Sequence, residues 1–417
     1  MRAAVQRRLL LAGLLLLGGA RGEPLGVFNA RIWQGGDTYS LGAIEIEAGR
    51  IAAIRSGLSE EWDGARMDAG GRFVVPGLID THVHLLAGGG DPPDSQESLE
   101  ALLDAGVASR LKSFLAAGVT TVSSSGDFWP EIRELARSVG AGQLQGPRIL
   151  YMGPFFSIPG GHPDATMCTD RRRVDPWCRG KLLVDLSNPG QVETALADLV
   201  GAVGIKLVYD DLGAVRIRHV DVASASDLVQ RAARRGLSVH AHVYDPREGL
   251  ELIGLGVRRF VHVPGSADRE ANRALFAAMR DQDVMAASTL SMLDFAVERT
   301  GALTTRRRLI GARFLAPLLA REGLLAFGTD VPWVAPAGAV RREIGLLRQA
   351  GLSPLEVLQS ATQHAASYLG RETELGRIAP GYVADLLVLQ SDPLEGERGL
   401  LDPLVVVKSG RIVVDRR

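Results

Sequence analysis

Residues 76–84 read Pro76-Gly77-Leu78-Ile79-Asp80-Thr81-His82-Val83-His84, an apolar run that ends in two histidines one residue apart. The apolar part, from Phe73 to Ile79, is typical of a buried strand. Side chains at positions i and i+2 of a strand point to the same face, so His82 and His84 can converge on one metal ion. A single pair of this kind is common in ordinary strands, so a metal site requires further ligands elsewhere in the chain.

Seven further apolar runs follow this strand and alternate with helical stretches. They cover residues 119–123, 148–152, 204–209, 237–242, 258–263, 284–288 and 324–329. Eight strands alternating with helices over roughly 250 residues predict an α/β fold of the (β/α)8 TIM-barrel type, whose chemistry sits at the C-terminal ends of the strands. A doubly wound open sheet is the alternative, and it is disfavoured because no glycine-rich dinucleotide motif follows the first strand.

Short β-like runs with turn signals occupy both ends of the chain, at residues 25–67 and again at residues 385–389, 404–407 and 412–414. We expect these ends to build one small discontinuous β-sandwich domain, from residues 23–72 and 371–417. The barrel would then span residues 73–370. Residues 153–180 form an insertion after the third strand, long enough to shape the mouth of an active site.

The first 22 residues have the layout of a secretory signal peptide: a basic start, an apolar run over residues 9–17 and a small-residue stretch that ends near Gly22. We therefore expect an exported protein, periplasmic or secreted, with no membrane attachment after cleavage. An uncleaved anchor is the alternative, but the apolar run is short for a membrane span. The twin arginines Arg7 and Arg8 leave the export route open.

The composition is that of an ordinary globular protein, with 46% hydrophobic and 23% charged residues, and it excludes disorder and collagen-like repeats. Without the four arginines of the leader, the formal charge falls from -1 to -5. We therefore expect no nucleic-acid partner. A small-molecule substrate is the expected partner, and a homo-oligomer is left open.

Two cysteines, Cys168 and Cys178, lie ten residues apart in the insertion. In an oxidising compartment this spacing favours a disulfide. A structural zinc site is disfavoured, because two thiols without neighbouring histidines fall short of four ligands.

Four polar residues fall at or near the C-terminal ends of different expected strands: Lys206, His240, His262 and Asp330. Spacings of 34 residues from Lys206 to His240 and 22 from His240 to His262 each match about one βα unit. With His82 and His84, these residues predict one site at the barrel mouth.

Several other segments are typical of one enzyme family. They read AGVTTV at residues 117–122, GPRI at 146–149, PLEVL at 354–358, AT at 361–362 and LGRIAPGYVADL at 375–386. With the histidine pair, they make nearly the whole chain after the leader resemble the amidohydrolase superfamily of metal-dependent hydrolases. Within it, the chain looks most like the imidazolonepropionase-related branch, which includes lysine-bridged dipeptidases of the prolidase type.

The resemblance implies a centre of two divalent metal ions. His82 and His84 would bind the more buried ion, and His240 and His262 the more exposed one. Lys206 would bridge them as a carbamate, because a free ammonium cannot ligate a cation. Zinc is favoured, while manganese, iron and cobalt stay open.

Asp330 would ligate the first ion and take the proton from the bridging water. Simpler structural readings exist: Asp330 as a helix N-cap, and Lys206 as a buried lysine paired with Asp210 or Asp211. Glu343 is most simply part of a solvated helix face.

Three residues are candidates for substrate contact: His162 in the insertion, and His242 and Tyr244 after the fifth strand. His242 shares a strand face with His240 and is an alternative ligand in its place, although the family pattern favours His240.

The resemblance implies hydrolysis of an amide bond in a small substrate, such as a dipeptide or an N-acyl amino acid, by a metal-bound hydroxide. A lactone, ester or organophosphate hydrolase is an alternative, because the same hydroxide attacks several electrophiles. A mononuclear deaminase is disfavoured because Val243 occupies the position of its usual glutamate. A non-catalytic binding protein on the same fold predicts a broken ligand, and none of the six is missing.

Overall fold

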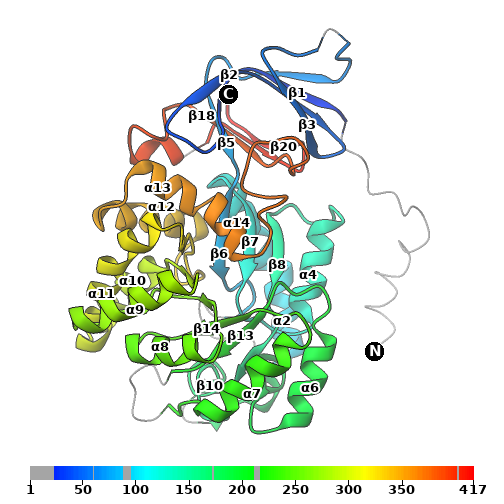
Figure 1. Cartoon of the computed structure of the whole chain (residues 1–417). Coiled ribbons are helices and arrows are strands. Elements are labelled where there is room, and N and C mark those ends of the chain that lie inside the picture. The colour runs from blue at the N-terminus through cyan, green and yellow to red at the C-terminus, as the bar shows by residue number, and fades with distance from the viewer. Residues whose placement is uncertain (1–22, 60, 88–94, 171–172, 211–216, 402) are drawn as a thin grey trace.

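The computed structural model describes residues 23–417 except residues 60, 88–94, 171–172, 211–216 and 402. The expected signal peptide, residues 1–22, lies outside the described residues. The fold is α/β, with parallel strands flanked by helices and a separate β domain at one end (Figure 1). Among the described residues, no helix is both long enough and apolar enough to cross a membrane.

The β domain is built from both ends of the chain, as expected (Figure 1). Its strands follow the order β20-β19-β18-β5-β1-β2-β3, with β4 beside β1. Their bounds are β1 (Leu25–Trp33), β2 (Tyr39–Glu47), β3 (Arg50–Arg55), β4 (Ala65–Asp68), β5 (Phe73–Pro76), β18 (Leu386–Leu389), β19 (Val405–Lys408) and β20 (Arg411–Asp415). Its strands pair as one eight-stranded sheet rather than as the two separate sheets expected for a β-sandwich, and apolar side chains from both ends of the chain, such as Ile46 and Val407, share one buried core.

The run from Phe73 to Ile79 is divided between the two parts of the molecule. β5 pairs with β1 and β18 in the β domain, whereas β6 (Leu78–Val83) pairs with β7 among the parallel strands. Gly77 lies at the crossing point, and a Cβ there would lie 2.2 Å from Thr120 Oγ1. Only glycine fits this close approach. Because β5 pairs within the β domain, that domain extends to Pro76 rather than ending at residue 72.

The parallel strands form two sheets, β6-β7-β8 and β12-β9-β13-β14-β15-β16-β17. Their bounds are β7 (Val119–Ser124), β8 (Arg148–Tyr151), β9 (Phe155–Ser157), β12 (Leu183–Asp185), β13 (Ile205–Val208), β14 (Val239–His242), β15 (Arg259–Phe260), β16 (Met285–Ala287) and β17 (Leu325–Ala326). Backbone hydrogen bonds from Thr81 N to Phe327 O (2.9 Å) and from Asp330 N to His82 O (2.8 Å) join the two sheets on one side. Among the described strands, no pairing of β8 with β9 closes the other side, so the closed eight-stranded barrel stays a prediction.

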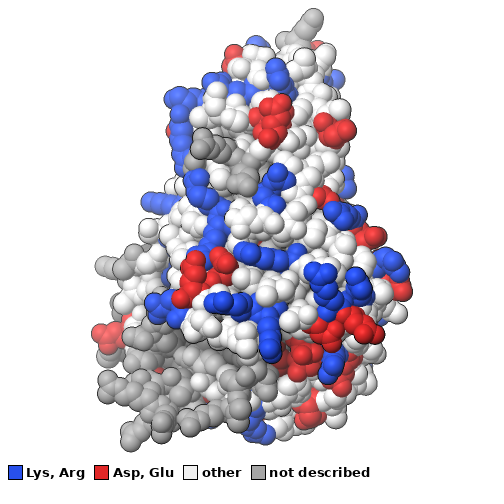
Figure 2. Space-filling view, turned by 90° about the vertical axis from the view of Figure 1, so that its left-hand side faces the viewer, with Lys and Arg blue, Asp and Glu red and all other residues white. Residues whose placement is uncertain are grey.

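Helices surround these sheets (Figure 1). They are α2 (Gln96–Leu102), α3 (Ala108–Ala116), α4 (Glu131–Gly140), α5 (Pro176–Leu182), α6 (Pro189–Asp198), α7 (Val222–Ala233), α8 (Pro246–Gly254), α9 (Arg269–Asp281), α10 (Leu290–Thr300), α11 (Leu303–Arg321), α12 (Pro336–Gln349), α13 (Pro354–Ser360) and α14 (Gln363–Tyr368), with a π-helical turn at Leu103–Val107 and a 3-10 turn at Glu397–Leu400. Apolar residues on the inner faces, among them Leu275 and Leu315, pack into one continuous core with the strands. On the face shown in Figure 2, basic and acidic side chains are interspersed.

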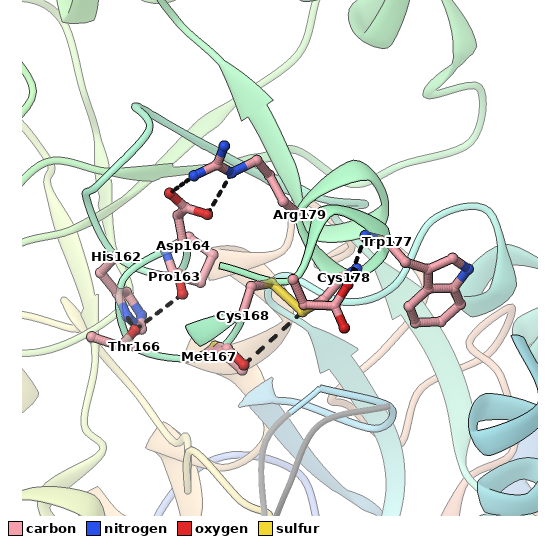
Figure 3. The surroundings of a disulfide bond; sticks show 10 residues. His162, Pro163, Asp164, Thr166, Met167, Cys168, Trp177, Cys178 and Arg179 are labelled. Carbon is pink, nitrogen blue, oxygen red and sulfur yellow. Dashed lines mark hydrogen bonds and ion pairs between the residues drawn. A yellow bond between two sulfur atoms is a disulfide. The ribbon is translucent and has the colours of Figure 1, made fainter. Parts of the chain in front are cut away.

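The insertion folds as a small unit with an internal disulfide. It contains β9, the hairpin of β10 (Thr169–Asp170) and β11 (Arg173–Val174), and the helix α5. Cys168 and Cys178 form a disulfide, with their Cα atoms 5.4 Å apart (Figure 3). The expected disulfide is therefore confirmed.

Candidate metal centre

A cavity of about 270 Å³ opens at the C-terminal ends of the parallel strands. Its polar lining comes from strand ends, from the insertion and from α11, and consists of His82, His84, His162, Lys206, His242, Tyr244, His262, Asp330, Thr166, Thr305 and Arg308. Side chains of three strands and of the segment after β17 therefore converge there, as expected for the C-terminal face of this type of fold.

His82 and His84 turn the same ring nitrogen toward the cavity. The Nδ1 atom of His82 lies 2.7 Å from the carbonyl oxygen of Val261, and that of His84 lies 2.6 Å from the carbonyl oxygen of Gly126. A carbonyl oxygen only accepts, so both Nδ1 atoms carry the proton. The lone pairs of the two Nε2 atoms, 3.4 Å apart, are thereby directed at one point.

Asp330 and Lys206 complete this side of the centre. Asp330 Oδ1 lies 3.4 Å from His82 Nε2 and 3.3 Å from His84 Nε2, and Lys206 Nζ lies 3.4 Å from His82 Nε2. Burial opposes ionisation of Asp330, but the surrounding nitrogen groups, the cation Lys206 among them, outweigh it and lower its pKa to about 2. Burial lowers the pKa of Lys206 to about 7 and that of His82 well below its usual range. The site thus offers an ionised carboxylate, a neutral imidazole and a readily deprotonated amine.

His262 and His242 form the second half of the cluster. His262 Nδ1 contacts the hydroxyl of Thr289 at 2.8 Å, and its Nε2 lies 3.0 Å from Nδ1 of His242. The other nitrogen of His242, Nε2, lies 3.5 Å from Asp210 Oδ1. Burial lowers the pKa of both rings, so both are neutral and can act as ligands.

His240 does not reach the cavity, contrary to the expectation that it ligates the more exposed ion. The centre of its ring lies 5.0 Å from that of Tyr368, with the two rings nearly perpendicular, and His240 is not among the residues that line the cavity. A Cβ on Gly204, the residue before β13, would lie 2.7 Å from His240 Cδ2. The absence of a side chain at Gly204 leaves the space that this ring fills, whereas His242, two residues nearer the strand end, lines the cavity.

Comparison with known proteins identifies the family. The model of the amidohydrolase family matches residues 73–414. The chain belongs to the amidohydrolase family.

Among its relatives, the ochratoxinase of Aspergillus niger is 25% identical over 81% of this chain and 75% of its own length. The imidazolonepropionase of Cupriavidus taiwanensis is 26% identical over 84% of this chain and 85% of its own. Among solved structures, a putative prolidase from Bifidobacterium longum is 28% identical, with a TM-score of 0.74 over 95% of this chain and 96% of its own. These relatives confirm the expected resemblance to the imidazolonepropionase and prolidase-like members of the family.

In this amidohydrolase, the backbone of Asp330 is held in a rare conformation. Its φ is +56°, in the left-handed region that few residues other than glycine adopt. The preceding Thr329 donates from its amide (3.0 Å) and its hydroxyl (2.6 Å) to the carboxylate of Asp80, which also accepts the amide of His82 at 3.2 Å. Asp80 therefore ties the histidine pair to the segment that carries Asp330, a role that its position in the opening motif could have suggested.

A second buried carboxylate supports the loop after His84. Asp127 accepts the backbone amides of Leu85 (2.7 Å) and Leu86 (2.9 Å) and the hydroxyl of Ser124 (2.7 Å). The adjacent Gly126 supplies the carbonyl that orients His84. Sequence reasoning missed Asp127, because the backbone amides that it accepts, those of Leu85 and Leu86, lie 42 and 41 residues away in the chain.

Glu343 is fully buried, so the expectation of a solvated helix face was wrong. Its carboxylate accepts the amides of Leu290 (3.0 Å) and Ser291 (2.6 Å) and so caps α10 from the neighbouring helix α12. Thr289, at the N-cap position of α10, makes no side-chain cap hydrogen bond there. Its hydroxyl instead contacts His262, so Glu343 supplies the cap that Thr289 does not.

The three expected substrate-contact residues all line the cavity. The Nδ1 atom of His162 contacts the hydroxyl of Thr166 at 2.5 Å, and its ring lies 5.3 Å from that of His242. The ring of Tyr244 stacks on that of His262 at 4.7 Å. Their roles toward a substrate stay predictions.

An ion pair between a buried carboxylate and a partly exposed guanidinium holds the insertion segment that carries His162. The Nε and Nη2 atoms of Arg179 each lie 2.7 Å from a carboxylate oxygen of Asp164 (Figure 3). The same carboxylate accepts the amide of Gly160 at 2.7 Å. Asp164 is fully buried, and Arg179 follows Cys178 directly. The disulfide and the ion pair therefore cross-link the same two segments.

Proposed function

We propose that this amidohydrolase is exported and cleaves an amide bond of a small substrate, such as a dipeptide or an N-acyl amino acid. The observation that carries the proposal is the convergence of imidazoles, a buried lysine and a carboxylate on one cavity. The family and the likeness to prolidase structures support a hydrolase of carbon–nitrogen bonds and a closed (β/α)8 barrel.

The donor set fits divalent metal ions. One ligand atom each of His82, His262 and Asp330 lies within 4.8 Å of the others, and all three residues are buried. Two oriented imidazoles beside a carboxylate suit zinc. We infer two ions, with His82, His84 and Asp330 holding one and His242 and His262 the other.

In this proposal, His242 takes the place expected for His240, and Lys206 joins both halves of the centre as a carbamate. The lowered pKa of Lys206, about 7, supports this, because only the neutral amine can react with carbon dioxide. A carbamate would turn the cationic end of Lys206 into an anionic oxygen donor.

The residues have separate roles in hydrolysis. Divalent ions, when bound, polarise a carbonyl and lower the pKa of water. Asp330, ionised at neutral pH, accepts the proton of the attacking water and passes it to the leaving amine. His162 and Tyr244 flank the cavity and orient the substrate.

Export is supported by the leader at residues 1–22 and by the disulfide, which persists in oxidising compartments. A periplasmic or secreted location follows. Sequencing the N-terminus of the protein recovered outside the cytoplasm tests this location, and an intact Met1 on cytoplasmic protein contradicts it.

Metal analysis of purified protein tests the centre. We expect about two equivalents in the parent protein, one or none in Lys206→Ala and His242→Ala, and two in His240→Ala, which is the matched control. Two equivalents in His242→Ala and one in His240→Ala would reinstate the ligand expected from the sequence. Metal-free protein under metal-replete conditions would favour a binding protein on this fold.

A substrate panel then tests the reaction class. Dipeptides and N-acyl amino acids should be hydrolysed in preference to lactones and phosphotriesters. Activity on the esters alone would move the assignment to the alternative hydrolases.

A further inference from the structure

The remaining wall of the cavity has a chemical character of its own. It is largely apolar, from Met167, Met292, Leu293, Ala296 and Trp333. Among the described residues that line it, the basic side chains besides the histidines are Lys206, at the metal cluster, and Arg308. Arg308 is thus the guanidinium that lines the cavity beyond the metal cluster.

The position of Arg308 is set by the aromatic ring beneath it. It comes from α11, and its Cζ lies 4.6 Å from the centre of the Tyr244 ring. That ring in turn stacks on His262 at 4.7 Å with an angle of 23° between planes. The guanidinium of Arg308 and the imidazole of His262, a proposed metal ligand, therefore both pack on the Tyr244 ring.

We propose that Arg308 is a specificity-determining residue that binds the carboxylate of an N-acyl amino acid, with the apolar side chain of that amino acid against Met292, Leu293 and Trp333. The inference deepens the proposed function and rests on it. A guanidinium binds carboxylates through paired hydrogen bonds, and an apolar wall favours aromatic or large aliphatic groups.

The spacing of these packed groups suits this substrate class. In an N-acyl α-amino acid, three bonds separate the scissile carbonyl carbon from the carboxylate carbon, about 3 to 4 Å by standard bond lengths. A carboxylate that close to the reacting carbon requires a cation near the metal cluster, on a side chain that packs on the same ring as a metal ligand. Arg308 meets that requirement, and the ring on which it packs is rigid.

Two substrates that differ only in the carboxylate test the proposal: N-acetyl-L-phenylalanine and N-acetyl-2-phenylethylamine. The parent enzyme should prefer the first. Arg308→Met should lower kcat/KM for N-acetyl-L-phenylalanine about 10- to 100-fold, the worth of a hydrogen bond to a charged group, and leave the amine-derived amide unchanged. Arg308→Lys should restore part of the loss. Arg307→Met, on the exposed side of the same helix, is the matched control.

Equal losses on both substrates, or none on either, would overturn the proposal, provided that thermal unfolding and metal content match the parent protein. If the metal-loaded parent hydrolyses neither amide, the proposed function fails on these substrates. In that case, the affinity for N-acetyl-L-phenylalanine, measured by calorimetry, tests the carboxylate subsite independently of hydrolysis. Binding at least tenfold weaker in Arg308→Met upholds it, and equal binding in parent and variant overturns it.

Discussion

The cross-linked insertion allows a local prediction of defined size. Replacing Cys168 and Cys178 together by serine removes the disulfide and leaves the Asp164–Arg179 ion pair in place (Figure 3). We expect the segment of residues 160–168, which carries His162 into the cavity, to open more often. The rest of the molecule should keep most of its stability, because Cys168 and Cys178 lie at the part of the core under this loop, whereas residues such as Leu275 and Leu315 pack elsewhere.

The magnitude follows from the length of the closed loop. The two cysteines are ten residues apart, and closing a loop of that size restricts the unfolded chain by about 3 kcal/mol. That free energy corresponds to roughly a 100-fold change in the population of the open loop. The melting temperature of the whole protein should shift by only a few degrees, since large proteins lose few degrees per kcal/mol.

Hydrogen exchange followed by mass spectrometry measures this opening directly. Amides of residues 160–168 should exchange up to 100-fold faster in the double-serine variant and in the parent protein treated with reductant, while peptides from α9 and α11 keep their rates. Adding Asp164→Asn should speed exchange further, because it weakens the second cross-link. Unchanged exchange in residues 160–168 of the double-serine variant would refute the view that the disulfide restrains this loop.

Three further substitutions probe the supports of the centre. Asp127→Asn should lower the free energy of unfolding by about 1 to 3 kcal/mol, because an amide nitrogen cannot accept the backbone amides of Leu85 and Leu86 that this carboxylate accepts. Urea unfolding measures the loss, and unchanged stability would argue against that network. Gly204→Ala should lower the free energy of unfolding by a similar amount, because the added methyl group clashes with His240. Its metal content should stay at the parent level. Calorimetry and metal analysis together test this, and a loss of metal would mean that His240 does ligate. Burial raises the pKa of Glu343, so ionising it opposes folding. The parent protein should therefore lose stability relative to Glu343→Gln as the pH rises above about 4.5. A stability difference between the two proteins that changes in the opposite direction between pH 5 and 8 would contradict this assignment.

Most of the parallel strands could be predicted from the sequence, because buried strands between helices leave a clear apolar pattern. The short strands β9 and β12 were not predicted, since β9 lies in the stretch expected as an insertion and β12 directly follows α5. The boundary at Gly77 could not be predicted either, since the apolar run continues without a break from the β domain into β6. What divides the run is the close approach of Thr120 to Gly77, a contact between residues more than 40 positions apart.

The site shows the same division. Alternation along a strand puts His240 and His242 on one face, but their depth depends on where β14 ends and on the space beside Gly204. Glu343 resembled a solvated helix residue because its partners belong to another helix. Periodicity identifies the face of an element, whereas the neighbour that covers the face is set by tertiary packing.

The sheet shared by the two ends of the chain has a consequence for how the protein assembles. Strand β5 leads into the first parallel strand, yet its partner β18 is synthesised about 310 residues later. Until then, β5 presents an unpaired edge, which other chains can join. Contacts of such long sequence separation also form slowly. We expect folding to be completed only after synthesis, and a chain cut before Leu386 to aggregate even with every metal-binding residue present.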